Sequence, residues 1–315
     1  MRLPILGVMA LHGLISVTVV AAQGPSGPSI GKTVDAFIQA KMKERPIPGL
    51  AVAVIRDGRL EKLSAFGIAN LEFGVGVTVD TLFSVASVSK AFAGLAVMRL
   101  VEDGSISLDD LASKHLTQLP LAWRAVTVRQ LLNHTSGLPV IDVDAFSTRT
   151  RAQTIPDALR LLGNEPLMSP VGAQWNYNGT NYMLLGMLIE AVSGTSFAEF
   201  CRLRFFEPLG IRTATFGDSR AVVANRATVY TRFRFDAPQP QRIERSEVLD
   251  YSMPTFAYPA AGLNISIRDF ATWMLALHQE RLVTRRCLSR RARCYTPSPR
   301  ADSRPLGRCA SGSRR

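Results

Sequence analysis

The sequence predicts a mixed α/β (α+β) fold, in which an antiparallel sheet flanked by helices is joined to a mostly helical part. Two short apolar runs, at 50–55 and 60–66, are connected through Asp57-Gly58, a dipeptide typical of tight β-hairpins. Several later segments carry apolar residues with helical spacing. With 315 residues, 47% of them hydrophobic, the chain is long enough to build a substantial core.

The first 22 residues have the pattern of a cleaved secretory signal peptide. Arg2 precedes an apolar run at 3–20, and the small residues Ala21 and Ala22 close the run as a cleavage site. The alternative is an uncleaved anchor, but a proline, a histidine and two glycines interrupt a run that is barely long enough to span a bilayer. We therefore expect a periplasmic or secreted protein without a stable membrane anchor after cleavage, in which residues 23–30 form a linker.

Apolar periodicity and helix-ending residues predict the remaining elements in order. A first helix is expected at 31–45, where Pro46 follows, and a second begins near Ser87 and ends near Gly104. The second helix is apolar enough to be central rather than peripheral. Further helices are expected at 127–134, 182–192, 198–206 and 267–278. Residues 220–250, rich in arginine and interrupted by prolines, predict either an irregular excursion or a pair of exposed strands.

The net charge of +12 is concentrated at one end of the chain. Residues 281–315 hold eleven arginines and one acidic residue, which leaves 26 basic and 24 acidic side chains in the other 280 residues. The body is thus nearly neutral, and together with the predicted export this argues against a nucleic-acid partner. Three of the four cysteines also lie in this tail, so no disulfide framework is indicated, and Cys201 is expected to be a small buried side chain.

The segment at 83–92 carries the clearest chemical signal, because Ser87 stands three residues before Lys90 where an apolar helix begins. Residues three apart share a helix face, so the amine would lie beside the hydroxyl and could draw its proton. The helix N-terminus would favour an oxyanion formed there. Ser-x-x-Lys also occurs by chance in exposed helices, so this spacing alone does not establish catalysis.

A second motif follows about ninety residues later, where Tyr177 lies in a polar, aromatic loop at 175–182 just before an apolar helix. Together with the segments at 131–139, 208–210 and 261–263 and with Asp269, this order resembles the serine β-lactamase and penicillin-binding-protein superfamily. The nearest group resembles class C β-lactamases, D-alanyl-D-alanine carboxypeptidases and related esterases. The resemblance runs from about Val34 to Leu277.

This resemblance implies a β-lactamase/transpeptidase-like fold with the site between its two parts, and it implies roles for three residues. Ser87 would be the acylated nucleophile, Lys90 its proton-drawing partner, and Tyr177 a base whose anionic form the Lys90 ammonium favours. The Ser87 N–H would supply half of an oxyanion hole. A tyrosine that merely fills a loop is the alternative for Tyr177, and His134 is expected to be structural.

The resemblance also implies an acyl substrate: a β-lactam, a D-alanyl or peptidoglycan-like peptide, or an ester. The family asparagine two positions after the tyrosine is replaced by Gly179, so Asn178 or Asn181 would have to bind the substrate amide from a neighbouring position. No cofactor is implied. A metal site is not indicated, because no two of the four histidines lie close together.

The third family motif, Lys-Thr-Gly or His-x-Gly on a late strand, is not present. No lysine occurs after Lys114, and neither His134 nor His278 is followed by glycine two residues later. We therefore expect an incomplete hydrolase domain at 31–280 that lacks C-terminal strands, leaving the first two strands with an uncovered edge and face and the chain poorly stable and weakly active or inactive. A non-catalytic binding protein is the second hypothesis.

The tail at 281–315 lacks apolar periodicity and is expected to be disordered and outside the family pattern. Its bias toward Arg, Ser, Pro, Ala and Cys is what an out-of-frame reading of a GC-rich gene would give, which predicts a frameshifted or truncated family member. The alternative is a functional basic arm that contacts a lipid or cell-wall polyanion. The oligomeric state is not predicted.

Overall fold

The computed structural model describes residues 30–140, 156, 159, 165–217, 220–234, 241–251 and 253–287. The chain divides into two units, at Met1–Arg45 and Pro46–Arg315. In the first unit α1 spans Ile30–Glu44, which confirms the first predicted helix. The predicted signal peptide lies outside the described residues, and so do residues 23–29 of the predicted linker.

The second unit begins with the predicted hairpin. Strands β1 (Gly49–Arg56) and β2 (Arg59–Asn70) pair in antiparallel fashion, and β3 (Val75–Gly76) pairs with the far end of β2. Both turn residues have positive φ, 49° at Asp57 and 71° at Gly58, as a two-residue type I′ hairpin turn requires. The expectation of two antiparallel strands is confirmed.

A second small sheet carries the segment that leads into the site. It has the order β4-β8-β5, formed by Leu82–Ser84, Leu263–Ser266 and Thr215–Phe216. The central strand β8 is buried along its whole length. Since β4 and β8 pair although about 180 residues separate them, this sheet joins segments that are far apart in the sequence.

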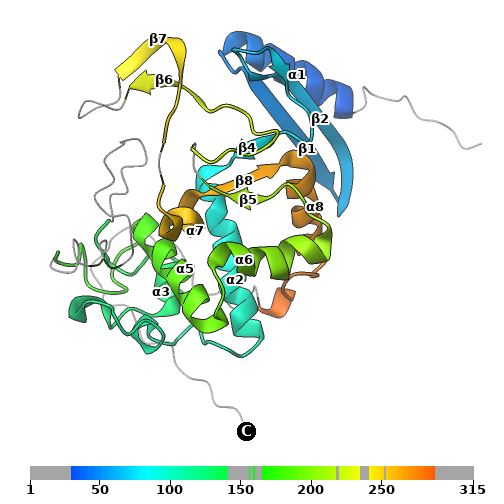
Figure 1. Cartoon of the computed structure of the whole chain (residues 1–315). Coiled ribbons are helices and arrows are strands. Elements are labelled where there is room, and N and C mark those ends of the chain that lie inside the picture. The colour runs from blue at the N-terminus through cyan, green and yellow to red at the C-terminus, as the bar shows by residue number, and fades with distance from the viewer. Residues whose placement is uncertain are drawn as a thin grey trace, which may run out of the picture. The chain divides into compact units, whose positions relative to one another are not determined.

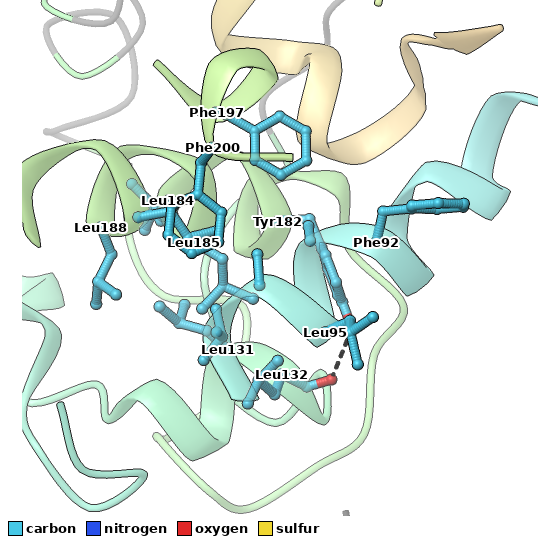
Figure 2. Packing of buried hydrophobic residues seen from close by; sticks show 14 of the residues in the cluster. Phe92, Leu95, Leu131, Leu132, Tyr182, Leu184, Leu185, Leu188, Phe197 and Phe200 are labelled. Atoms are coloured by element: carbon cyan, nitrogen blue, oxygen red, sulfur yellow. Dashed lines mark hydrogen bonds between the residues drawn. The ribbon is translucent and has the colours of Figure 1, made fainter. Parts of the chain in front are cut away.

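Helix α2 (Ser89–Glu102) forms the centre of the hydrophobic core, as the sequence predicts. It contacts α5 (Gly179–Ser193) and α6 (Phe197–Cys201), while α3 (Val128–Leu132) packs on α5. Figure 2 shows how apolar side chains from these four helices meet, and how the Tyr182 hydroxyl reaches the Leu132 carbonyl at 3.1 Å. The helical part is therefore one continuous core around α2.

The later elements agree with the predictions in part. Helix α8 (Ile267–His278) coincides with the predicted helix, whereas α6 ends at Cys201 and the chain continues as a π-helical turn over Arg202–Phe206. The short α7 (Tyr258–Ala261) was not predicted. Of the two alternatives for 220–250, the pair of exposed strands is correct: β6 (Tyr230–Arg234) pairs with β7 (Gln241–Val248).

The surroundings of β1 and β2 correct one expectation. Helix α8 packs on both strands, so a face of this sheet that was expected to be uncovered is covered. Among the described strands, β1 has β2 as its single neighbour, and no described strand follows β8. The expected uncovered edge is thus present in the described part of the chain.

The packed structure extends beyond the predicted boundary at residue 280. Leu282, Val283 and Cys287 are buried, and the Cys287 thiol donates to the carbonyl of Met98 in α2 at 3.4 Å. These three residues of the expected tail therefore belong to the core, whereas the other described residues between 281 and 287 are exposed. Residues 288–315 lie outside the described part, so the disorder expected there stays a prediction.

Two segments bear on membrane contact. The apolar run at 3–20 lies outside the described residues. Within the described residues, no single helix is both long and apolar enough to cross a membrane. One pair of helices, Gly179–Ser193 and Phe197–Leu209, has the length and apolar composition of a span when the two are taken together, but they are bent by 74° relative to each other.

Candidate active site

The candidate nucleophile Ser87 lies in a 3-10 turn, Ala86–Val88, between β4 and α2. Ala86 has a φ of 44°, a left-handed conformation that costs a residue with a side chain roughly 1–2 kcal/mol. The buried hydroxyl of Ser89 holds the turn: it donates to the Ala86 carbonyl at 2.6 Å and accepts from the Leu263 N–H of β8 at 2.9 Å. The sheet thus fixes the backbone at the nucleophile.

The Lys90 ammonium is held between two oxygens. Its Nζ lies 3.2 Å from Ser87 Oγ and 2.8 Å from the carbonyl oxygen of Ala260 in α7. The side chain is buried, so these bonds replace contacts that water would otherwise make. The predicted proximity of serine and lysine is present, and a backbone carbonyl that the sequence did not indicate aims the amine at the hydroxyl.

Tyr177 joins this pair from the loop that precedes α5. The Lys90 Nζ lies 5.0 Å from the centre of the Tyr177 ring and 5.8 Å from that of Tyr182. Burial raises the pKa of Tyr177, but hydrogen bonds from Lys90 and Ser87 and the ammonium charge more than offset this, so its pKa lies below the ordinary 10.0. The structure therefore brings Ser87, Lys90 and Tyr177 together.

Asn178 and Asn181, predicted to bind substrate, are both buried and engaged within the protein. Asn178 caps α5 by accepting from the Thr180 N–H at 2.8 Å and donates to the Leu138 carbonyl at 2.7 Å. Asn181 accepts from the Ser136 hydroxyl at 2.6 Å. Both amides tie the tyrosine loop to residues 136–139, so they serve a structural role here, and the substrate contact expected of them stays a prediction.

Gly179, which stands where the family has its amide-binding asparagine, is the first residue of α5. A Cβ built there would make an ordinary contact with the Met183 side chain, at 3.8 Å, so the position has room for a side chain. A side chain that could bind a substrate amide is absent at this position, as the sequence predicts.

Two contributors to the site were missed in the sequence. Ser89 had a signal, since a polar residue one position before Lys90 on an apolar helix needs a buried partner. The Ala260 carbonyl had none, because any residue type supplies a backbone oxygen. Across the described ranges, no three His, Cys, Asp or Glu side chains are grouped so as to hold a metal ion.

Comparison with known proteins agrees with this geometry. The family model described as Beta-lactamase matches residues 34–307. Protein flp of Staphylococcus aureus (strain MW2) is 26% identical over 187 residues, and penicillin-binding protein 4 of Amycolatopsis lactamdurans is 33% identical over 173 residues. These matches cover 58% and 53% of this chain but 38% and 44% of the relatives, so the chain aligns with less than half of either protein.

A solved structure extends the likeness to the fold. The D-amino acid amidase of Ochrobactrum anthropi SV3, in complex with D-phenylalanine, superimposes with a TM-score of 0.69 at 24% identity, covering 81% of this chain and 74% of that one. The fold is thus β-lactamase/transpeptidase-like, with antiparallel sheets and helices as predicted. Because the family model spans most of the chain and the serine-lysine-tyrosine geometry accompanies it, the chain belongs to the β-lactamase family of serine hydrolases and penicillin-binding proteins.

Proposed function

We propose that this chain is an exported serine hydrolase that forms an acyl-enzyme on Ser87. The observation that carries the proposal is the fixed position of Lys90 Nζ, 3.2 Å from Ser87 Oγ and aligned by the Ala260 carbonyl. In this arrangement Ser87 Oγ attacks the substrate carbonyl carbon while its proton passes to a neighbouring base. The leaving group departs with a proton returned by that base, and water then releases the acyl group by the same route.

The base is Tyr177 acting beside Lys90. The lowered pKa of the phenol makes its anionic form more accessible, and the ammonium compensates the charge. The oxyanion that forms during attack is stabilised by the Ser87 N–H, which lies in the 3-10 turn just before α2, where the dipole of the helix adds to the effect. Rate losses of about 10²–10⁴-fold are usual when such a proton-transfer group is removed.

The substrate class is an acyl compound with a reactive or strained carbonyl: a β-lactam, a D-alanyl or peptidoglycan-like peptide, or an ester. The names of the similar proteins, a penicillin-binding protein and a D-amino acid amidase, support carbonyl chemistry next to a D-configured residue. The apolar run at 3–20 with its small-residue end supports a periplasmic or secreted location.

Covalent labelling tests the proposal. A fluorescent penicillin and a fluorophosphonate are each incubated with the purified chain, and the labelled peptide is identified by mass spectrometry. Label on Ser87, absent in Ser87→Ala and slowed in Lys90→Met, supports an activated nucleophile. Label that persists in Ser87→Ala, or no label on a folded wild type, refutes it.

One observation favours a second function, that of a binding protein without turnover: the sequence contains no Lys-Thr-Gly or His-x-Gly motif after Lys114. Such a protein would be labelled slowly or not at all, yet would still bind an acyl ligand beside Ser87. Robust hydrolysis of nitrocefin or p-nitrophenyl acetate, abolished in Ser87→Ala, excludes this alternative. Saturable binding of penicillin without hydrolysis supports it.

A further inference from the structure

His134 holds the backbone of the tyrosine loop on both sides of Tyr177. Its carbonyl oxygen accepts from the N–H of Asn176 at 2.8 Å, and its Nδ1 accepts from the N–H of Asn178 at 3.1 Å. These are the residues immediately before and after Tyr177. The imidazole ring also lies against the tyrosine, with ring centres 4.7 Å apart. A single buried residue therefore fixes both peptide groups that flank the proposed base.

The hydrogen-bond pattern defines the protonation state of this imidazole. A backbone N–H can only donate, so Nδ1 of His134 carries no proton and the ring is neutral, with its proton on Nε2. The neighbouring bonds agree: the Ser136 hydroxyl donates to Oδ1 of Asn181 at 2.6 Å, which turns the Asn181 amide nitrogen toward Nδ1, at 3.2 Å. Two donors thus converge on one unprotonated ring nitrogen.

We propose that His134 is a positioning residue that keeps Tyr177 against Lys90, and that it does so only as the neutral imidazole. This inference rests on the proposed function, because it assigns a partner to the base. Protonated Nδ1 would oppose the N–H of Asn178 and the amide nitrogen of Asn181. Among the described residues, the titratable groups against the ring are Tyr177 in the loop and Tyr182 of α5, whose ring centre is 5.2 Å away; the nearby charge is the Lys90 ammonium, 5.0 and 5.8 Å from the centres of these two tyrosine rings.

The backbone at His134 allows a matched pair of test variants. Its φ of 62° is left-handed, a conformation that asparagine and glycine adopt readily. In His134→Asn the side-chain oxygen can occupy the place of Nδ1 and accept the same N–H groups. In His134→Gly the acceptor is lost without backbone strain. Both variants lose the ring, and only His134→Asn keeps a side-chain acceptor. Thermal unfolding followed by circular dichroism shows whether each variant is folded.

The first readout is the titration of the Tyr177 phenol, measured as the ultraviolet difference between each protein and its Tyr177→Phe counterpart. We expect His134→Asn to titrate close to the wild type, below the ordinary value of 10.0, and His134→Gly to return to about 10. If the two variants titrate alike, whether both are shifted or both are not, the acceptor does not position the tyrosine and the inference is overturned.

The second readout is the rate at which a fluorophosphonate labels Ser87, followed against pH. We expect a loss of about tenfold or more in His134→Gly and near wild-type rates in His134→Asn, since small displacements of a reacting group have effects of this size. Loss of the Tyr177 anion slows labelling of both the wild type and His134→Asn as the pH falls, but protonation of His134 should make the wild-type rate fall more steeply at acidic pH. Parallel pH profiles of these two proteins overturn the requirement for neutral His134.

The two readouts separate this inference from the proposed function. If no protein is labelled while the Tyr177 titration still follows the acceptor at position 134, the proposed hydrolase function fails and the positioning role stands. If Ser87 is labelled while the pKa of Tyr177 is the same in both variants as in the wild type, the hydrolase proposal stands and the positioning role is refuted.

Discussion

Gly186 on α5 should control the position of Lys90 although it does not touch the lysine. A Cβ built on Gly186 would lie 2.3 Å from Cγ of Pro259 and 3.1 Å from its Cβ. The next residue in α7, Ala260, carries the carbonyl that accepts from Lys90. We therefore predict that Gly186→Ala pushes α7 away and loosens the alignment of the lysine with Ser87.

The magnitude follows from these distances. The separation of 2.3 Å falls 1.1 Å short of the 3.4 Å at which ordinary contact begins, and a proline ring cannot rotate away. If α7 withdraws by that amount, the bond of 2.8 Å from Lys90 to the Ala260 carbonyl is broken. Overpacking should lower the free energy of unfolding by about 1–3 kcal/mol, and the better helix propensity of alanine should offset up to about 1 kcal/mol of this loss. Labelling of Ser87 should slow by about ten- to a hundredfold.

A double-mutant cycle with Pro259→Ala is the control, because it removes the Cγ atom 2.3 Å away and leaves only the milder contact with Cβ at 3.1 Å. The assay measures the free energy of unfolding by urea and the rate of fluorophosphonate labelling for the wild type, both single variants and the pair. The double variant should label faster than Gly186→Ala. The reasoning is refuted if Gly186→Ala labels within about twofold of the wild type while its stability falls, or if the pair is no faster than that single variant.

Three further predictions concern stability and reactivity. Asp269→Ala should lower the free energy of unfolding by about 3 kcal/mol, because Oδ2 of Asp269 accepts from the N–H groups of Arg212 and Thr213 and from the Thr213 hydroxyl. Asp269→Asn, which keeps an acceptor oxygen, should lose less, and equal urea midpoints for the two variants would contradict this. Hydrogen bonds from the Ser107 N–H, His115 and Lys114 lower the pKa of Asp110 from 3.8 to about 2. The ionised Asp110 therefore contributes to the free energy of unfolding above pH 3.8, and this contribution is lost as the pH falls toward about 2. The stability of Asp110→Asn should depend less on pH than that of the wild type in this range, and parallel curves for the two proteins would count against it. Burial raises the pKa of the Cys201 thiol well above its ordinary value, so this thiol should react with a disulfide reagent only after denaturant is added; rapid labelling in the native state would show otherwise.

Local patterns in the sequence were sufficient for most elements of the fold. The Asp57-Gly58 turn fixes a hairpin because both residues accept positive φ, and the apolar spacing of α2, α5 and α8 marks buried helices. The short α7 and the π-helical turn after Cys201 escaped prediction, because neither has enough residues to show a period. The burial of Leu282 and Val283 was not predicted either, because two apolar residues in an arginine-rich segment show no helix or strand periodicity.

What the sequence determined by itself is the spacing of Ser87 and Lys90 where a helix begins and the place of Tyr177 before a later helix, because these depend on local geometry and on order along the chain. Only the tertiary structure decided how these groups are held. The Lys90 partner at Ala260 is 170 residues away, and the bonds from His134 to the tyrosine loop cross about 40 residues. The burial of Asn178 and Asn181 was decided in the same way. Hydrogen-bond partners between distant segments depend on how the core brings backbone groups together, and a residue pattern contains no record of that packing.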